Sequence, residues 1–164
     1  MSEVARHFRP ITEGDQAFLT EMLYLAFFVP EGAALFPRSI LDRPDILKYH
    51  LGYGKPGDYG FLAYEGREAL GAIWCRLHSQ DDPGYGFVRP DIPELNIALL
   101  PQARGKGIGQ QLMQYLEEEL RAKGVPGISL SVDYRNTTAH YIYQKLGYEK
   151  VKEEGTAITM LKLF

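Results

Sequence analysis

The chain contains a single cysteine, Cys75, among its 164 residues. One thiol cannot close an internal disulfide, and the histidines and cysteine show none of the spacings of a metal site. The sequence therefore predicts a protein of a reducing, cytoplasmic compartment that uses no metal.

Long apolar runs and an excess of positive charge are missing as well. No apolar stretch approaches the roughly 20 residues that span a bilayer, and residues 1–10 lack the apolar core of a signal peptide. The 18 Lys and Arg residues are outnumbered by 21 Asp and Glu, giving a net charge of −3. A nucleic-acid surface would need a basic stripe. We therefore expect neither a membrane nor a nucleic acid among the partners.

What remains is the composition of a globular domain, with 45% hydrophobic and 24% charged residues. No repeat, low-complexity segment or linker interrupts the chain, so residues 1–164 are expected to form one domain. Hydrophobic periodicity and turn residues place the elements. The expected strands are 8–11, 59–64, 69–78, 94–100, 128–132, 148–153 and 156–163, and the expected helices are 15–28, 45–51, 110–123 and 136–146.

The strand-helix-strand order across residues 94–132 requires a right-handed crossover and a parallel strand pair. Hairpins on either side add antiparallel strands. The predicted class is α/β (α+β), a mixed, mostly antiparallel central sheet of about six or seven strands flanked by about four helices. Along the helix after residue 107, the expected buried face contains Ile108, Leu112, Tyr115, Leu116 and Leu120, whereas Glu117 is expected to face solvent with its charged neighbours.

A glycine-rich turn between a strand and a helix is the most informative stretch. Residues 102–109 read Gln-Ala-Arg-Gly-Lys-Gly-Ile-Gly. Glycine allows a tight turn and close approach of a ligand, and the free amides at a helix start attract phosphate. Lys106 is not followed by Ser or Thr, so the turn is not a Walker A loop. The glycines are also spaced wrongly for a dinucleotide fingerprint.

The turn resembles the Q/R-x-x-G-x-G/A loop of the GNAT family of N-acetyltransferases, which holds the pyrophosphate of acetyl-coenzyme A. Gln102, Gly105 and Gly107 match that motif. The resemblance implies a cradle of backbone N–H donors, with Lys106 as a solvent-facing cation near the phosphates. The predicted donors are those of Arg104, Gly105, Lys106, Gly107, Ile108 and Gly109.

A second motif follows about 30 residues later. Residues 136–148 resemble the GNAT segment N-x-x-A-x-x-F/L-Y-x-K-x-G-F, and the matching residues are Asn136, Ala139, Tyr143, Lys145 and Gly147. With the strand-helix opening at 8–28, the resemblance covers essentially the whole chain. It implies a GNAT fold with splayed parallel central strands, in which Ile97, Ala98 and Leu99 lie beside the pantetheine arm like an added strand.

Helical spacing places Asn136, Ala139, His140 and Tyr143 on one face. In the resembling family, Asn136 would cap the helix and bond pantetheine, and Ala139 would leave room for the ligand. Tyr143 would protonate the departing thiolate as general acid. The alternative is a core tyrosine with a satisfied hydroxyl, and Tyr141 is the second candidate for the acid.

The resemblance also implies a general base that removes a proton from the amine, often through a water. Glu94, at the start of the central strand, is the candidate, because several enzymes of the family have a glutamate at about this place. Burial beside a cleft would raise its pKa and suit it to this task. The alternative is a solvated carboxylate at a strand start. Asp133, His78 and His140 are rival bases. A backbone N–H from a bulged central strand could stabilise the carbonyl oxygen, and Asn96 could contact the acceptor or be satisfied within the sheet.

The resemblance implies an acetyl-coenzyme A-dependent N-acetyltransferase that moves an acetyl group to a primary amine by direct attack in a ternary complex. A small-molecule amine is favoured, and the acidic Asp81 and Asp82 favour a cationic one. The alternatives are a non-catalytic coenzyme A-binding module, an enzyme acting on protein N-termini or lysines, or another acyl donor. For Cys75, the interpretation as a buried structural thiol is favoured over that as an acyl-accepting nucleophile. A homodimer through sheet edges is compatible with the resemblance.

Overall fold

The computed structural model describes residues 6–164, so the first half of the amino-terminal stretch considered above lies outside the described residues. Seven strands among these residues form one sheet in the order β1-β2-β3-β4-β5-β7-β6. All neighbours pair antiparallel except β4 and β5, which are parallel. The strands are β1 (Arg6–Pro10), β2 (Tyr59–Glu65), β3 (Glu68–Arg76), β4 (Glu94–Leu99), β5 (Gly127–Asp133), β6 (Glu149–Glu154) and β7 (Ala157–Leu163). The expected mixed, mostly antiparallel sheet is confirmed.

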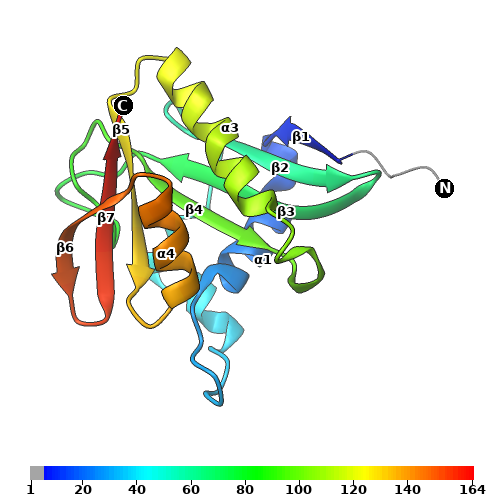
Figure 1. Ribbon diagram of the computed structural model, residues 1–164, viewed down its shortest axis with the longest axis horizontal. Coiled ribbons are helices and arrows are strands. Elements are labelled where there is room, and N and C mark those ends of the chain that lie inside the picture. The colour runs from blue at the N-terminus through cyan, green and yellow to red at the C-terminus, as the bar shows by residue number, and fades with distance from the viewer. Residues whose placement is uncertain (1–5) are drawn as a thin grey trace.

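Four α-helices accompany the sheet in the described chain, with short 3-10 turns at 13–15, 38–42 and 101–103. They are α1 (Gln16–Ala26), α2 (Pro44–Leu47), α3 (Ile108–Ala122) and α4 (Thr137–Lys145). In Figure 1, α3 and α4 lie in front of the sheet and α1 lies behind it. No helix within residues 6–164 is long and apolar enough to cross a membrane.

The helix expected over 45–51 is wrong beyond its first turn, because α2 ends at Leu47. Residues 49 and 50 instead form turn bonds, from the Tyr49 amide to the carbonyl of Ile46 at 3.0 Å and from the His50 amide to the carbonyl of Leu47 at 3.2 Å. Side chains of β3 bind the carbonyls that follow. Arg76 Nη1 donates to the carbonyls of Lys48 and Leu51, at 3.0 and 2.7 Å. Trp74 Nε1 donates to the carbonyl of Tyr49 at 2.7 Å. These tertiary hydrogen bonds satisfy the carbonyls of the irregular segment after α2, and local sequence cannot reveal them.

Two apolar clusters cover opposite faces of the sheet. The face under α3 and α4 buries Ile73, Cys75 and Leu95 against α3. The opposite face buries Leu62, Trp74 and Ala98 against α1 and the segment at 40–53. Because side chains alternate along a strand, residues 95, 97 and 99 of β4 face α3, and residues 94, 96 and 98 face the α1 side.

Glu117 of α3 corrects the expectation of a solvent-facing carboxylate, since it is only 6% exposed. The ammonium group of Lys162 donates to its Oε1, and the hydroxyl of Tyr148 donates to its Oε2 at 3.4 Å. Lys162 also donates to the carbonyl of Leu146, at 2.7 Å. The carboxylate thus connects α3 with β7 and the end of α4, a contact that the helical pattern does not contain.

Candidate active site

The parallel strands β4 and β5 separate almost at once. Within the described chain, their only register pair is Glu94 with Ser129, next to a hydrogen bond from the Ser129 amide to the carbonyl of Pro93 at 3.0 Å. Beyond this pair the strands diverge, which confirms the predicted splayed pair. We call the resulting space the split.

The edge of β4 that faces the split keeps free backbone groups. The amide of Leu100 donates to the carbonyl of Leu70, at 2.8 Å, on the β3 side. Backbone groups of an antiparallel strand alternate in direction, so those of Ala98 also point to β3, whereas those of Ile97 and Leu99 point into the split. Of the three predicted pantetheine contacts, Ile97 therefore offers a free amide and carbonyl and Leu99 a free amide, because the Leu99 carbonyl accepts a hydrogen bond from Arg104 Nε at 3.4 Å. The regular β3–β4 register contains no bulge in these strands, contrary to the bulged strand expected.

The glycine turn joins β4 to α3 at the far end of the split. Gly105 and Gly107 have φ values of 76° and 79°, a left-handed conformation that other residues adopt only with strain. Gly107 is the N-cap of α3, and no described side chain caps its first amides. A β-carbon placed on Gly109 would lie 3.8 Å from Ile97 and 3.9 Å from Leu99. The helix start therefore sits directly over β4.

The other turn residues lie as follows. Gln102 and Lys106 are exposed, so Lys106 faces solvent as predicted. The amide of Arg104 already donates to the carbonyl of Pro101 at 3.3 Å, and its Nε donates to the carbonyl of Leu99 at 3.4 Å. The remaining predicted amides, from Gly105 onward, are thus better candidates for an anion than that of Arg104.

Helix α4 begins at a cap that matches the sequence motif. The side chain of Asn136 accepts a hydrogen bond from the Ala139 amide at 3.3 Å, which fixes the first turn. Tyr143 is half-buried, with its ring 6.1 Å from that of Tyr148. Burial raises the pKa of its phenol to about 12, so the hydroxyl stays protonated at neutral pH. Tyr141, the second candidate, is 66% exposed on the outer face.

Glu94 lies at the closed end of the split and is only 3% exposed. The alternative of a solvated carboxylate is therefore wrong. Burial raises its pKa to about 7, opposed by the Gly86 amide, the Tyr49 hydroxyl and the charge of Lys48. A β-carbon on Gly84 would lie 2.1 Å from Glu94 Oε1 and 2.8 Å from the Tyr49 hydroxyl. Glycine at position 84 therefore lets the backbone of this loop pack directly against the carboxylate.

Tyr49 is a site residue that the sequence interpretation did not single out from the other aromatics of its segment. Its hydroxyl oxygen accepts a hydrogen bond from the amide of Tyr85. Its ring contacts that of His78 edge-on, with the ring centroids 5.3 Å apart. Burial raises the pKa of its phenol well above the usual value. The only advance signal was a tyrosine in a proline- and glycine-bounded segment, which does not identify a contact with Glu94.

The rival bases differ in their surroundings. Asp133 is paired with Arg135 at 2.7 Å, and this partner lowers its pKa, which weakens it as a base. Burial lowers the pKa of His78 to about 4, with further contributions from Lys48 and Arg76. Cys75 is fully buried and burial raises its thiol pKa, which supports the structural thiol over a nucleophile.

Several buried polar atoms beside the split have no partner. Buried polar groups are rarely left without a hydrogen bond, so each such atom suggests a missing water or ligand. Three belong to the diverging strands and one to α4. Within residues 6–164 the unpartnered atoms are Glu94 Oε1, Asn96 Nδ2, Ser129 Oγ, His140 Nε2 and His78 Nε2. This arrangement fits an extended ligand with polar groups along its length.

Glu94 and Tyr143 approach the split from opposite faces of the sheet. Glu94 forms a register pair with Arg76 and shares its α1-side face, whereas Tyr143 packs with the cluster under α3. Because the split joins the two faces, a carrier bound on the α4 side and an acceptor on the α1 side could meet there.

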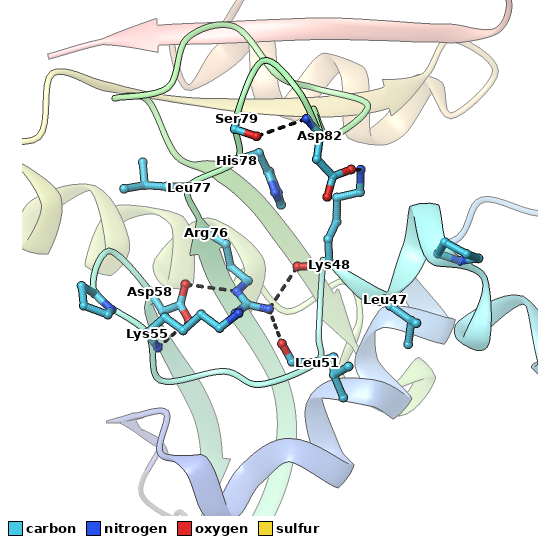
Figure 2. A pocket seen from close by; sticks show the side chains of 12 residues that line it. Leu47, Lys48, Leu51, Lys55, Asp58, Arg76, Leu77, His78, Ser79 and Asp82 are labelled. Atoms are coloured by element: carbon cyan, nitrogen blue, oxygen red, sulfur yellow. Dashed lines mark hydrogen bonds and ion pairs between the residues drawn. The ribbon is translucent and has the colours of Figure 1, made fainter.

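An open pocket of about 570 Å³ lies on the α1 side, beyond the end of β3. Figure 2 shows Arg76 at its centre, bonded to Asp58 and to the carbonyls of Lys48 and Leu51. His78 forms part of its wall. Asp82, which the sequence suggested as an attractor for a cationic amine, is instead paired with Lys48.

Comparison with known proteins agrees with this geometry. The chain matches the Acetyltransferase (GNAT) family over residues 18–148. It is 29% identical over 136 residues to the mycothiol acetyltransferase of Streptomyces scabiei, covering 83% of this chain and 40% of that one. The chain thus spans well under half the length of this relative.

Solved structures show the same fold at low identity. An acetyltransferase from Thermus thermophilus superposes with a TM-score of 0.69 at 21% identity, covering 99% of this chain and 100% of that one. The PaiA N-acetyltransferase of Thermoplasma acidophilum, in complex with coenzyme A, gives 0.69 at 17% identity, with coverages of 98% and 99%. The chain belongs to the GNAT acetyltransferase family, as its two motifs predict.

Proposed function

We propose that this chain is an N-acetyltransferase that uses acetyl-coenzyme A to acetylate a primary amine, by direct attack in a ternary complex. The observation that carries the proposal is the split itself. It places free β4 backbone groups between an uncapped helix start and the buried carboxylate of Glu94, whose Oε1 has no hydrogen-bond partner.

The carrier would lie along β4. Its pyrophosphate would bind the amides of residues 105–109, helped by the positive end of the α3 dipole. Its pantetheine arm would pair with Ile97 and Leu99, near Ala98, Asn136 and Ala139. Gln102 and Arg104 would border the phosphates. No metal is needed for these contacts.

Acetyl-coenzyme A supplies a thioester carbonyl that an amine can attack, forming the amide as the carbon–sulfur bond breaks. Glu94 would accept the proton that the amine loses, directly or through a water. A carboxylate with a pKa near 7 is balanced between ionised and protonated forms at neutral pH. Tyr143 would donate its hydroxyl proton to the sulfur as the thiolate departs.

A small-molecule amine is the acceptor that we favour. The name of the relative from Streptomyces scabiei, mycothiol acetyltransferase, refers to a small-molecule product. The enclosed surroundings of Glu94, which is 3% exposed, also suit a compact acceptor. The buried, reduced thiol of Cys75 agrees with a cytoplasmic location.

The test is release of free thiol from acetyl-coenzyme A with the purified chain and a panel of amines, protein N-termini and lysine peptides. Acetylation of a small amine, identified by mass spectrometry, is the expected result. Binding of coenzyme A in a calorimeter without turnover on any acceptor would instead identify a non-catalytic module. Absence of binding would contradict the proposal altogether.

A further inference from the structure

The open pocket beyond β3 has more positive than negative charge. Burial lowers the pKa of His78 to about 4, so this side chain is neutral near pH 7. The remaining charged side chains in the lining are three cations and two carboxylates. They are Lys48, Lys55, Arg76, Asp58 and Asp82.

Both carboxylates are already used by the protein. Asp58 Oδ1 accepts from Arg76 Nε at 3.1 Å, and its Oδ2 accepts two backbone amides of the turn at 54–55. The Asp58–Arg76 pair is almost fully buried, with side chains 4% and 6% exposed. Asp82 is paired with Lys48. Neither acid is left to receive a cationic ligand.

The cations are not equally satisfied. Arg76 donates to the carbonyls of Lys48, Leu51 and Gly52 in addition to Asp58. Lys55 forms no ion pair among residues 6–164, and its side chain extends across the pocket in the direction of Arg76 (Figure 2). Its ammonium group is therefore the charge that a ligand could neutralise.

The pocket adjoins the proposed base. Arg76 at its centre pairs in register with Glu94 across β3 and β4, so the two residues share one face of the sheet. His78 lines the pocket and also contacts Tyr49, whose hydroxyl lies beside Glu94. The unpartnered His78 Nε2 adds a polar atom between the pocket and Glu94.

We propose that the acceptor carries an anionic group, a carboxylate or a phosphate monoester, which binds Lys55 in this pocket while its amine lies at Glu94. This inference rests on the proposed acetyltransferase function. A diamine or polyamine is disfavoured, because its second cation would meet a pocket that is already positive. The charge of the pocket thus reverses the preference for a cationic amine suggested by Asp81 and Asp82.

Matched acceptors of equal length test the charge preference. In 4-aminobutyrate, n-butylamine and putrescine, the far end of a four-carbon chain is anionic, neutral and cationic. We expect kcat/KM to fall in that order, by about tenfold between the anionic and neutral members, the effect of one charge-assisted contact. The compound 3-aminopropyl phosphate tests whether phosphate serves better than carboxylate.

Lys55→Met and Lys55→Glu test the residue. We expect Lys55→Met to abolish the advantage of 4-aminobutyrate over n-butylamine, mainly through KM, and Lys55→Glu to make putrescine the better acceptor. Lys152→Met, in the exposed strand β6, removes an equal charge away from the pocket and should preserve the order of acceptors.

The outcomes separate the two proposals. Turnover with no preference for the anionic acceptor, or equal effects of Lys55→Met on all three amines, would overturn the anionic acceptor and leave the acetyltransferase intact. Failure to release thiol with any amine would count against the acetyltransferase function itself.

Discussion

Burial changes the two proposed catalytic residues in ways that suit opposite tasks. It keeps the Tyr143 phenol protonated, with a pKa near 12, and so preserves a proton to donate. It holds the Glu94 carboxyl near pKa 7, so that the group can take a proton and release it again. Both shifts come from the removal of water from the charged form.

Replacement of Tyr143 by Phe removes the proposed acid and leaves the ring in place. We expect turnover to fall tenfold or more while coenzyme A affinity changes little, because the hydroxyl would act on the departing sulfur and not on the carrier's phosphates. Steady-state thiol release and calorimetry measure the two quantities. Tyr141→Phe is the matched control, and equal activities of the two variants would contradict the assignment.

Glu94 also links stability to pH. Its pKa in the folded state, about 7, is above the ordinary value of 4.5. Between these two pH values the folded state therefore keeps a proton on Glu94 that the unfolded state has released. The stabilisation is complete below pH 4.5 and is lost as pH rises through 7. Relative to Glu94→Gln, the wild-type free energy of unfolding should fall by at most about 3 kcal/mol between roughly pH 4.5 and pH 8.

Urea unfolding of both proteins across this pH range measures the difference. If the free energies of unfolding of the two proteins change with pH in parallel, the carboxyl of Glu94 titrates normally and the prediction is wrong. Independently, Glu94→Gln should lower the rate of acetyl transfer well over tenfold at pH 7.

At the scale of elements, the glycine turn offers a test with a matched control. Gly107 and Gly124 flank opposite ends of α3 and have φ values of 79° and 75°. A β-carbon added to either glycine would have no neighbour within 4 Å. Alanine at either position should therefore cost about 1 kcal/mol of stability through backbone strain alone.

Only Gly107→Ala should weaken coenzyme A binding, by about tenfold, because its methyl group would occupy the space where a phosphate approaches the helix start. Calorimetry and thermal unfolding of both variants provide the comparison. If the two variants bind coenzyme A equally well, the phosphate lies elsewhere.

The elements that sequence predicted well are those defined by local signals. The glycines at 105 and 107, the Asn136 cap and the buried stripe of α3 each depend on neighbours a few residues away. Tyr115 is the exception in that stripe, because it is 47% exposed. The failures depend on distant partners. The segment after α2 is fixed by Arg76 and Trp74 of β3, which bind the carbonyls of Lys48 and Tyr49, and Glu117 is buried because Lys162 reaches it.

The site shows the same division. Tyr143 follows from the second motif and Glu94 from its place at the start of the central strand, and their burial agrees with the expected roles. Tyr49 beside Glu94 and the neutralised Asp82 in the pocket come from segments without a readable motif, and only the folded chain brings them together.

At the scale of the whole molecule, the Glu117–Lys162 contact joins α3 to β7. Lys162→Met would leave Glu117 buried without its cation, and we expect a loss of about 2 kcal/mol because the lysine is only partly exposed. Lys152→Met, at an exposed pair in β6, should change stability by less than about 0.5 kcal/mol. Adding Glu117→Leu to Lys162→Met should recover part of the loss in urea unfolding, whereas equal stability of the two Lys→Met variants would contradict the contact.

The prediction of a homodimer through sheet edges has little support at β6. All its residues are exposed, charges dominate its sequence, and a register shift interrupts its pairing with β7. Such features oppose edge-to-edge association. Dimerisation, like the single domain predicted over 1–164, stays a prediction.

Because β4 and β5 diverge early, the boundary with the fewest backbone pairings lies in the middle of the sheet. Strands β1–β4 and β5–β7–β6 are two smaller sheets joined at one residue pair. Amide protons of Ile97 and Leu99, on a central strand, should therefore exchange with deuterium as fast as those of a sheet edge. A bound carrier that pairs with these two amides should slow this exchange. The substrate would then form the hydrogen bonds to β4 that β5 does not form.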